Sequence, residues 1–210
     1  MAKIAAHTHQ ICGLSWAPDG RQFASGGNDN LCCLFDVDTV LSEMKSAPLT
    51  PGRVASSPRS RNTSHGFSAA FNSREGAFGY YPQDTGVSTA EDGSKYRRIR
   101  TSDHTIINLG PGSERYCWIH GAAVKAMAFC PWRNGLLATG GGSSDRAIHF
   151  FHTSSGAALA TIDVSAQVTS LIWSTTKREI VATFGYPQPS HPYRVAIFSW
   201  PDCAQVGAIS

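Results

Sequence analysis

Histidine, cysteine and glycine supply the few residues of this chain whose type and spacing could support metal binding, nucleophilic catalysis or nucleotide binding. His149 and His152 lie three residues apart, which suits a shared metal only on a helix, and they fall in an apolar run that predicts a strand. Cys130 follows another apolar run but has no evident base partner. The run Gly140–Gly142 lacks the Gly-Lys-Ser/Thr that holds phosphate. We therefore expect no catalytic residue, no metal site and no cofactor.

The composition describes a chain that can bury one hydrophobic core. It has 210 residues, 41% of them hydrophobic, and 18 basic against 15 acidic residues leave a formal charge of +3. So small a charge creates no strong field, which disfavours a role based only on nucleic-acid binding. No stretch approaches the roughly 20 apolar residues of a membrane helix. We expect a soluble protein of the nucleus and cytoplasm, with reduced cysteines and no nucleic-acid, membrane or small-molecule partner.

An internal repeat organises the chain. Three segments align without a gap, and each alternates apolar with small or polar residues, as a strand with one buried face does. Each is followed by a second and a third short apolar run, and the runs are separated by turns rich in Gly, Asn and Asp. Each unit is therefore predicted to hold three short antiparallel strands. The aligned first runs are Ile11–Pro18, Val124–Pro131 and Val168–Thr175.

The repeat length selects the architecture. The second and third units start 44 residues apart, at Val124 and Val168, which is the spacing of WD-repeat propeller blades. Each of the first two units also carries a His, a Ser or Thr, and an Asp at matching places, and such a set forms hydrogen bonds across a WD blade. Asp29 and Asp145 are interpreted as structural turn residues and not as catalytic acids. The expected blade network comprises His7, Ser25, Asp29, His120, Thr139 and Asp145.

The predicted fold class is all-β, a WD-repeat propeller segment of about three of seven blades with a long inter-blade insert. Phe35, Phe151 and Phe198 occupy the Trp position of the repeat, so the ring is kept and the indole donor is lost. Residues 38–115 are rich in Ser, Gly, Pro and Thr, and we expect this low-complexity insert to be mostly disordered. The expected divisions are a WD repeat at 1–37, the insert at 38–115, and two further repeats at 116–210.

Two patterns in the insert admit a functional and a plain interpretation. Thr50-Pro-Gly-Arg53 fits a proline-directed kinase site, although such patterns arise often by chance in Ser/Pro-rich loops. The basic run Lys95–Arg100 suits a nuclear-import or RNA-contacting patch, or simply a solvated loop. Thr50 is thus a candidate phosphosite, and the basic run is left open.

The strings of the two best-preserved units resemble a particular family. Ile11–Gly20 and Ala24–Asn30, with Ala123–Trp132 and Ala138–Arg146, are similar to the Fizzy family of activators of the anaphase-promoting complex. The string Phe-Phe-His-Thr-Ser-Ser-Gly156, the segment Trp200–Cys203 and the long insert look most like its meiosis-specific fungal branch.

The resemblance implies a non-catalytic adaptor that activates a ubiquitin ligase and recruits degron-bearing substrates to it during the mitotic or meiotic cell cycle. Its implied partners are the subunits of the anaphase-promoting complex and those substrates. In the family, turn residues on the top face of the propeller bind a Lys-Glu-Asn degron. For the two asparagines, ordinary turn chemistry is an equal alternative. The residues carried over to the degron-binding role are Asn28, Asn30, Ser143 and Gln167.

The resemblance also has gaps. The family's amino-terminal docking segment, its Ile-Arg tail and its remaining blades have no counterpart in the sequence. Three units cannot close a propeller, and an open arc exposes strand edges. The expectation from sequence is therefore a fragment of an activator, with a generic WD-repeat interaction scaffold, or a non-functional fragment, as the alternatives.

Overall fold

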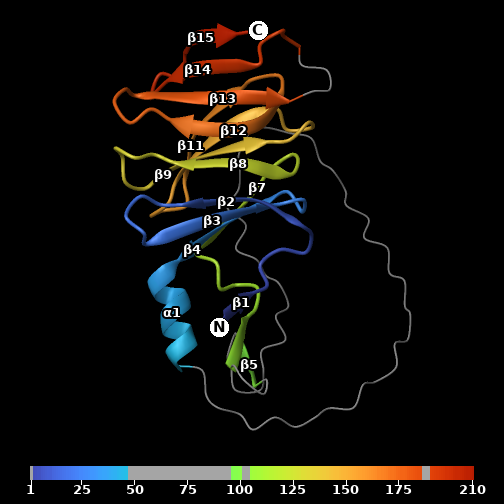
Figure 1. Ribbon diagram of the computed structural model, residues 1–210, viewed down its shortest axis with the longest axis vertical. Helices are drawn as coiled ribbons and strands as arrows, with labels where there is room; N and C mark the ends of the chain where they lie inside the picture. Colours follow the sequence, from blue (N-terminus) through green and yellow to red (C-terminus); the bar gives the residue numbers. More distant parts are fainter. Residues whose placement is uncertain (1, 47–95, 101–104, 186–189) are drawn as a thin grey trace, which may run out of the picture.

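The structure is a computed structural model that describes residues 2–46, 96–100, 105–185 and 190–210. Three four-stranded antiparallel sheets lie one above another in chain order, with the two chain ends at opposite ends of the stack (Figure 1). Within the described residues, no helix is long and apolar enough to cross a membrane.

The first sheet contains β2 (Ile11–Trp16), β3 (Gln22–Gly27), β4 (Leu31–Asp36) and β7 (Tyr116–Ile119). The second contains β8 (Val124–Phe129), β9 (Leu136–Gly141), β10 (Ala147–His152) and β11 (Ala158–Asp163). The third contains β12 (Gln167–Trp173), β13 (Glu179–Gly185), β14 (Val195–Ser199) and β15 (Gln205–Ile209).

The three sheets repeat one another down to a local irregularity. In each, the register between the first and second strands shifts directly after the start of the first strand, at Ile11/Gly13, Val124/Ala126 and Val168/Ser170. Because the bulge occurs at the equivalent place in all three sheets, it is a regular feature of the repeating unit. The sheets are therefore successive propeller blades, as the 44-residue repeat predicts.

Each blade has a fourth strand that the sequence interpretation missed. β11 (Ala158–Asp163) and β15 (Gln205–Ile209) are outer strands that pair with β10 and β14. Both are largely exposed, and they lack the alternation of apolar and polar residues that reveals a half-buried strand. The prediction of three strands per unit was short by one for this reason.

The insert interrupts the first blade and does not join two blades. The first sheet has the order β2-β3-β4-β7, so the chain leaves the sheet after Asp36 and returns to it at Tyr116 as the fourth strand. The expected inter-blade position was wrong because the four-residue β7 lies far from β4 in sequence. Residues 47–95, which include Thr50 and Lys95, lie outside the described residues.

The described parts of the insert contain regular structure. Helix α1 (Val37–Ser46) follows β4 directly. Strands β5 (Tyr96–Arg100) and β6 (Thr105–Leu109) form a hairpin, and β6 pairs in parallel with β1 (Ala2–Ile4). Figure 1 shows α1, β1 and β5 beside the first sheet, on the side away from the second sheet. The basic run is thus part of a strand, Tyr96–Arg100, where a loop was one of the two interpretations.

Apolar cores fill the spaces between these layers. Leu34, Trp118, Val124 and Phe151 are among the buried residues between the first two blades, and Phe150 packs with Trp173 and Trp200 between the second and third. A third core on the outer face of the first blade joins Cys33 and Phe35 to Val40 of α1 and Leu109 of β6. We call this third group the cap core.

Candidate functional site

Strand direction assigns every turn of a blade to one of two faces. On one face, the turn between the second and third strands lies beside the connector that enters the blade, since the Asn28 N–H donates to the Gln10 carbonyl at 2.8 Å. On the other face, the hairpin after the first strand meets the end of the third, as in the 2.9 Å bond from the Val37 N–H to the Arg21 carbonyl. We call these the upper face and the lower face.

All four residues predicted to bind a degron lie on the upper face. Asn28 and Asn30 belong to the β3–β4 turn, Ser143 to the β9–β10 turn, and Gln167 begins β12 directly after the connector from β11. They come from three successive blades, so the stacking of sheets brings their turns to one side of the molecule. Their binding role stays a prediction.

Asn30 also has a backbone role. Its φ is +66°, a left-handed conformation that Asn tolerates better than most residues, and Arg146 has a φ of +58° at the matching place in the second blade. The carbonyls of both residues accept a bond from the next connector, from His120 N at 2.8 Å and from Val164 N at 3.0 Å. The turn chemistry considered from sequence therefore applies to the backbone of Asn30.

The other three side chains differ in how they are held. The Cys12 thiol donates to the Asn28 amide oxygen at 2.9 Å, which fixes the position of that oxygen. Ser143 is exposed, and its carbonyl accepts a 2.8 Å bond from the Arg146 side chain. Gln167 is half-buried against Gly185, its partner across the β12–β13 pair. Cys12, which the sequence interpretation did not single out, thus orients one predicted site residue.

The first-blade network brings its three predicted members together. Ser25 donates to His7 Nε2 at 2.7 Å, and His7 Nδ1 donates to the Asp29 carboxylate at 3.0 Å. The Thr8 N–H also donates to Asp29, at 2.9 Å. Burial alone would raise the pKa of Asp29, but these bonds from His7 and Thr8 hold it below its usual value. The set ties the entering connector to the β3–β4 turn and so fixes the upper face of the blade.

In the second blade, the network residues form hydrogen bonds with different partners than in the first. Thr139 donates to His120 Nε2 at 2.7 Å, but Asp145 pairs with His149 Nε2 at 2.8 Å and not with His120. The other oxygen of Asp145 accepts the Gly121 N–H at 2.6 Å, so the connector is still held. His149 was considered from sequence only as a metal ligand. His149 lies on β10, two residues before Phe151 and on the same face of the strand. Its ring therefore lies beside the β9–β10 turn that carries Asp145.

Two buried histidine rings now lie side by side. The His120 and His149 centroids are 4.9 Å apart with the rings at 85°, and both residues are almost fully buried. Burial, with the neighbouring His149 ring, lowers the pKa of His120 to about 4. Burial would raise the pKa of Asp145, but the bonds from His149 and Gly121 lower it overall. His120 is therefore a neutral hydrogen-bonding residue at physiological pH.

The third blade holds its connector by other means. Thr169 and Thr183 share a 2.8 Å hydroxyl bond across β12 and β13. His191, from the β13–β14 connection, contacts the Val164 carbonyl at 2.7 Å and packs against Phe184 and Tyr193. A histidine from the turn thus binds the connector here, the reverse of the arrangement in the first two blades.

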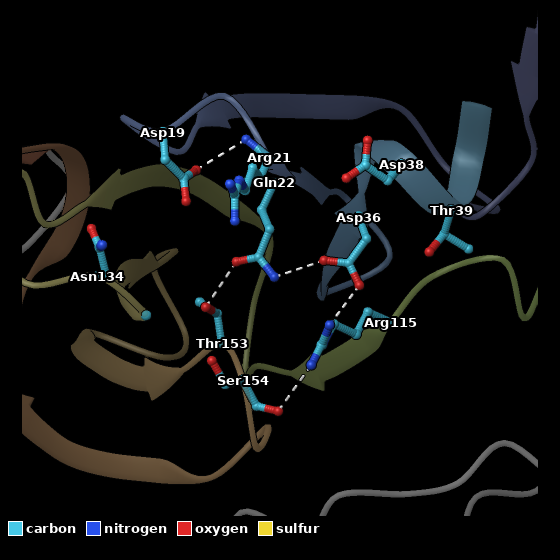
Figure 2. Close-up of a pocket in the computed structure, with 11 residues that line it drawn as sticks. Asp19, Arg21, Gln22, Asp36, Asp38, Thr39, Arg115, Asn134, Thr153 and Ser154 are labelled. Carbon is cyan, nitrogen blue, oxygen red and sulfur yellow. Dashed lines mark hydrogen bonds and ion pairs between the residues drawn. The ribbon is translucent and has the colours of Figure 1, made fainter. Parts of the chain in front are cut away.

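A polar hollow of about 430 Å³ lies on the lower face between the first two blades. Figure 2 shows the side chains that line it. In its lining, the two strands that flank the insert are joined, because Arg115 binds Asp36 at 2.7 Å. Arg115 also donates to the Ser154 carbonyl at 3.2 Å, and Thr153 donates to Gln22 at 2.9 Å. This hollow is on the face opposite the four predicted site residues. Its contacts fasten the base of the insert to the second blade.

No cluster of three or more histidine, cysteine or acidic side chains suited to a metal ion occurs among the residues that the structure describes. The hydrogen-bonded histidines each have hydroxyl, carbonyl or carboxylate partners. What the upper face offers instead is a set of neutral amide and hydroxyl groups in turns that buried networks hold in place.

Comparison with known proteins agrees with this architecture. Residues 1–36 match the family model described as WD domain, G-beta repeat. The WD40 domain of Toxoplasma gondii coronin aligns over 99% of this chain and 35% of its own, with a TM-score of 0.57 and 13% identity, a likeness of fold alone. The chain is a segment of a WD-repeat β-propeller.

Its relatives define a narrower group. It is 30% identical over 200 residues to meiotic fizzy-related protein 2 of Schizosaccharomyces pombe, covering 95% of this chain and 25% of that protein. It is 48% identical over 101 residues to the meiosis-specific APC/C activator protein AMA1 of Saccharomyces cerevisiae, 48% of this chain and 17% of that one. A chain in the crystal structure of the mitotic checkpoint complex aligns over 97% of this chain and 40% of its own, with 28% identity and a TM-score of 0.58.

The resemblance to the Fizzy family is thereby confirmed: the chain is related to the WD-repeat activators of the anaphase-promoting complex, meiosis-specific members among them. It spans about a quarter or less of the length of these relatives.

Proposed function

We propose that this protein is an activator of the anaphase-promoting complex that recruits degron-bearing substrates through the upper face of its propeller. The observation that carries the proposal is the similarity along almost the whole chain, with 31% identity over 208 residues to the anaphase-promoting complex subunit cdh1 of Dictyostelium discoideum. That match covers 99% of this chain and 22% of the relative. It therefore supports a shared propeller segment, and the activity of the whole protein is the proposal.

The chemistry of the upper face supports peptide recognition. Asn28 carries an amide whose oxygen accepts the Cys12 thiol, and Gln167 and Ser143 offer groups that both donate and accept. Such neutral groups can meet the ammonium, carboxylate and amide of a Lys-Glu-Asn degron together. The turns of Asn28 and Ser143 are fixed by the buried networks around Asp29 and Asp145, so these turns lose little conformational freedom on binding.

The remaining parts of the proposal concern mechanism and place. The protein acts without a catalytic centre of its own, as an adaptor whose partners are ligase subunits and substrates. Its site of action is the nucleus and cytoplasm during the mitotic or meiotic cell cycle. Relatives with meiotic names favour the meiotic assignment.

The test is a titration of the full-length protein with a fluorescent Lys-Glu-Asn peptide. Gln167→Ala and Asn28→Ala are expected to weaken binding at least tenfold each. At position 30 the substitution is Asn30→Gly, because glycine keeps the left-handed turn while it removes the amide. The control is Thr153→Ala on the lower face, which should leave peptide affinity unchanged.

A generic WD-repeat scaffold is the competing function, and the same titration separates the two. The scaffold predicts that no degron peptide binds, or that upper-face and lower-face variants bind equally well. Either result would withdraw the degron-binding assignment of this face.

A further inference from the structure

Two cysteines face each other at the base of the insert. Cys33 lies on β4, the last strand before the insert, and Cys117 lies on β7, the strand that follows it. They are partners in the β4–β7 register, and their Sγ atoms are 3.1 Å apart. Eighty-four residues separate them along the chain.

The ladder places this pair where a cross-strand disulfide fits. The His120 N–H donates to the Asn30 carbonyl at 2.8 Å, which makes Leu31 and Ile119 a non-hydrogen-bonded pair. Pairs alternate along an antiparallel ladder, so Cys33 and Cys117, two places further, are also a non-hydrogen-bonded pair. The Cα atoms of such pairs are about 4.5 Å apart, within the range of roughly 4.4 to 6.8 Å that a disulfide spans. The bond can therefore form without moving either strand.

We propose that Cys33 and Cys117 are a redox-active dithiol that closes to a disulfide and locks the first blade at the base of its insert. Oxidation by glutathione disulfide breaks two S–H bonds and forms one S–S bond. The two electrons and two protons pass to the oxidant, which leaves as two glutathione molecules. Cys117 is the half-buried member and attacks first, and Cys33, only 1% exposed, resolves the mixed disulfide.

The cap core controls access to the pair. Cys33 packs with Val40 of α1 and Leu109 of β6, and Cys117 packs against the same core. The bond to Cys117 and burial raise the pKa of the Cys33 thiol, which keeps it protonated and slow to react while the cap core is packed. β7 is a four-residue edge strand, so its local opening exposes the pair without unfolding the blade.

The other cysteines provide internal controls. Cys32 alternates to the opposite face of β4, where its thiol contacts the Met127 sulfur at 3.7 Å between the first two blades. Cys12 bonds Asn28 on the upper face, and Cys203 lies in the third blade. Geometry thus selects one pair from six thiols, and this choice can be measured.

The experiment is peptide mapping of the native protein after equilibration in glutathione redox buffers. The expected result is a mass decrease of about 2 Da and one cross-linked peptide pair joining Cys33 to Cys117, reversed by dithiothreitol. Cys33→Ser and Cys117→Ser should each abolish the cross-link, while Cys12→Ser and Cys203→Ser keep it. Because the closed loop is long, the oxidised form should melt on the order of 10 °C higher.

The mapping of the unsubstituted protein decides the matter even if the serine variants are unstable. Protein denatured before oxidation serves as the reference, since its six thiols pair without guidance from the fold. A native map that shows another pair, only glutathione adducts, or the same mixture as the denatured reference would overturn the proposal.

Discussion

Acidification should destabilise the second blade through His120, beginning at a pH well above the range in which ordinary carboxylates are protonated. The pKa of His120 is about 4 in the folded protein against 6.5 for an ordinary histidine, because the ring is buried beside His149. The unfolded chain therefore binds a proton at a pH where the folded chain does not. Its contribution to stability is present above pH 6.5 and is lost as the pH falls toward 4.

The magnitude follows from proton linkage. One extra proton on the unfolded state lowers the free energy of unfolding by about 1.4 kcal/mol for each pH unit. Over the interval from 6.5 to about 4 the loss is about 3 kcal/mol. That is a large fraction of the roughly 5 to 15 kcal/mol by which domains are stable.

Urea unfolding at pH 7.5, 6.5, 5.5 and 4.5 measures this slope. His120→Asn serves as the matched variant, because an amide can keep a bond to Thr139 and does not titrate. The variant should be less stable at pH 7.5 but should lose less stability on acidification. An unchanged slope in His120→Asn, or no slope in the unsubstituted protein between pH 6.5 and 5, would refute the reasoning.

Three further predictions concern packing and surface charge. Gly26→Ala should destabilise the protein by about 1 to 3 kcal/mol in urea melts, because the new Cβ would overlap the Val124 carbonyl of the next blade. Gly207→Ala should be neutral in the same assay, because no atom lies nearer than 3.7 Å to its new Cβ. Phe150→Ala should cost about 3 to 5 kcal/mol because the ring is fully buried against Trp173 and Trp200, and an equal loss in Leu159→Ala, 42% exposed, would contradict this. Asp36→Asn should cost less than about 1 kcal/mol, since the Asp36 and Arg115 side chains are 24% and 38% exposed, and high salt should shrink the difference.

The sequence was sufficient to predict the inner strands of each blade, but it was insufficient to predict how distant strands join into one sheet. Strands such as β8 and β13 were predictable because their residues alternate between a buried and an open face. β11 and β15 carry too few apolar residues to stand out, and β7 could not be assigned to the first blade without its pairing to β4. The inter-blade placement of the insert failed for the same reason: local patterns do not encode which distant strand completes a sheet.

The candidate site shows a similar division. Spacing alone grouped His7, Ser25 and Asp29, and the structure brings them into contact, because neighbouring strands and turns impose that geometry. The spacing could not show that Asp145 would bind His149, since both histidines of the second blade are compatible with the repeat. Nor could it show that Cys12 would orient Asn28, a contact across sixteen residues.

Stimulation of substrate ubiquitination by purified anaphase-promoting complex tests the central claim most directly. The full-length protein should raise ubiquitination of a substrate that carries a Lys-Glu-Asn degron and should have little effect when that degron is replaced by alanines. Combining Asn28→Ala with Gln167→Ala should remove the stimulation, while Thr153→Ala should preserve it. Failure of the unsubstituted protein to stimulate the ligase, or equal stimulation by the upper-face variant, would contradict the account.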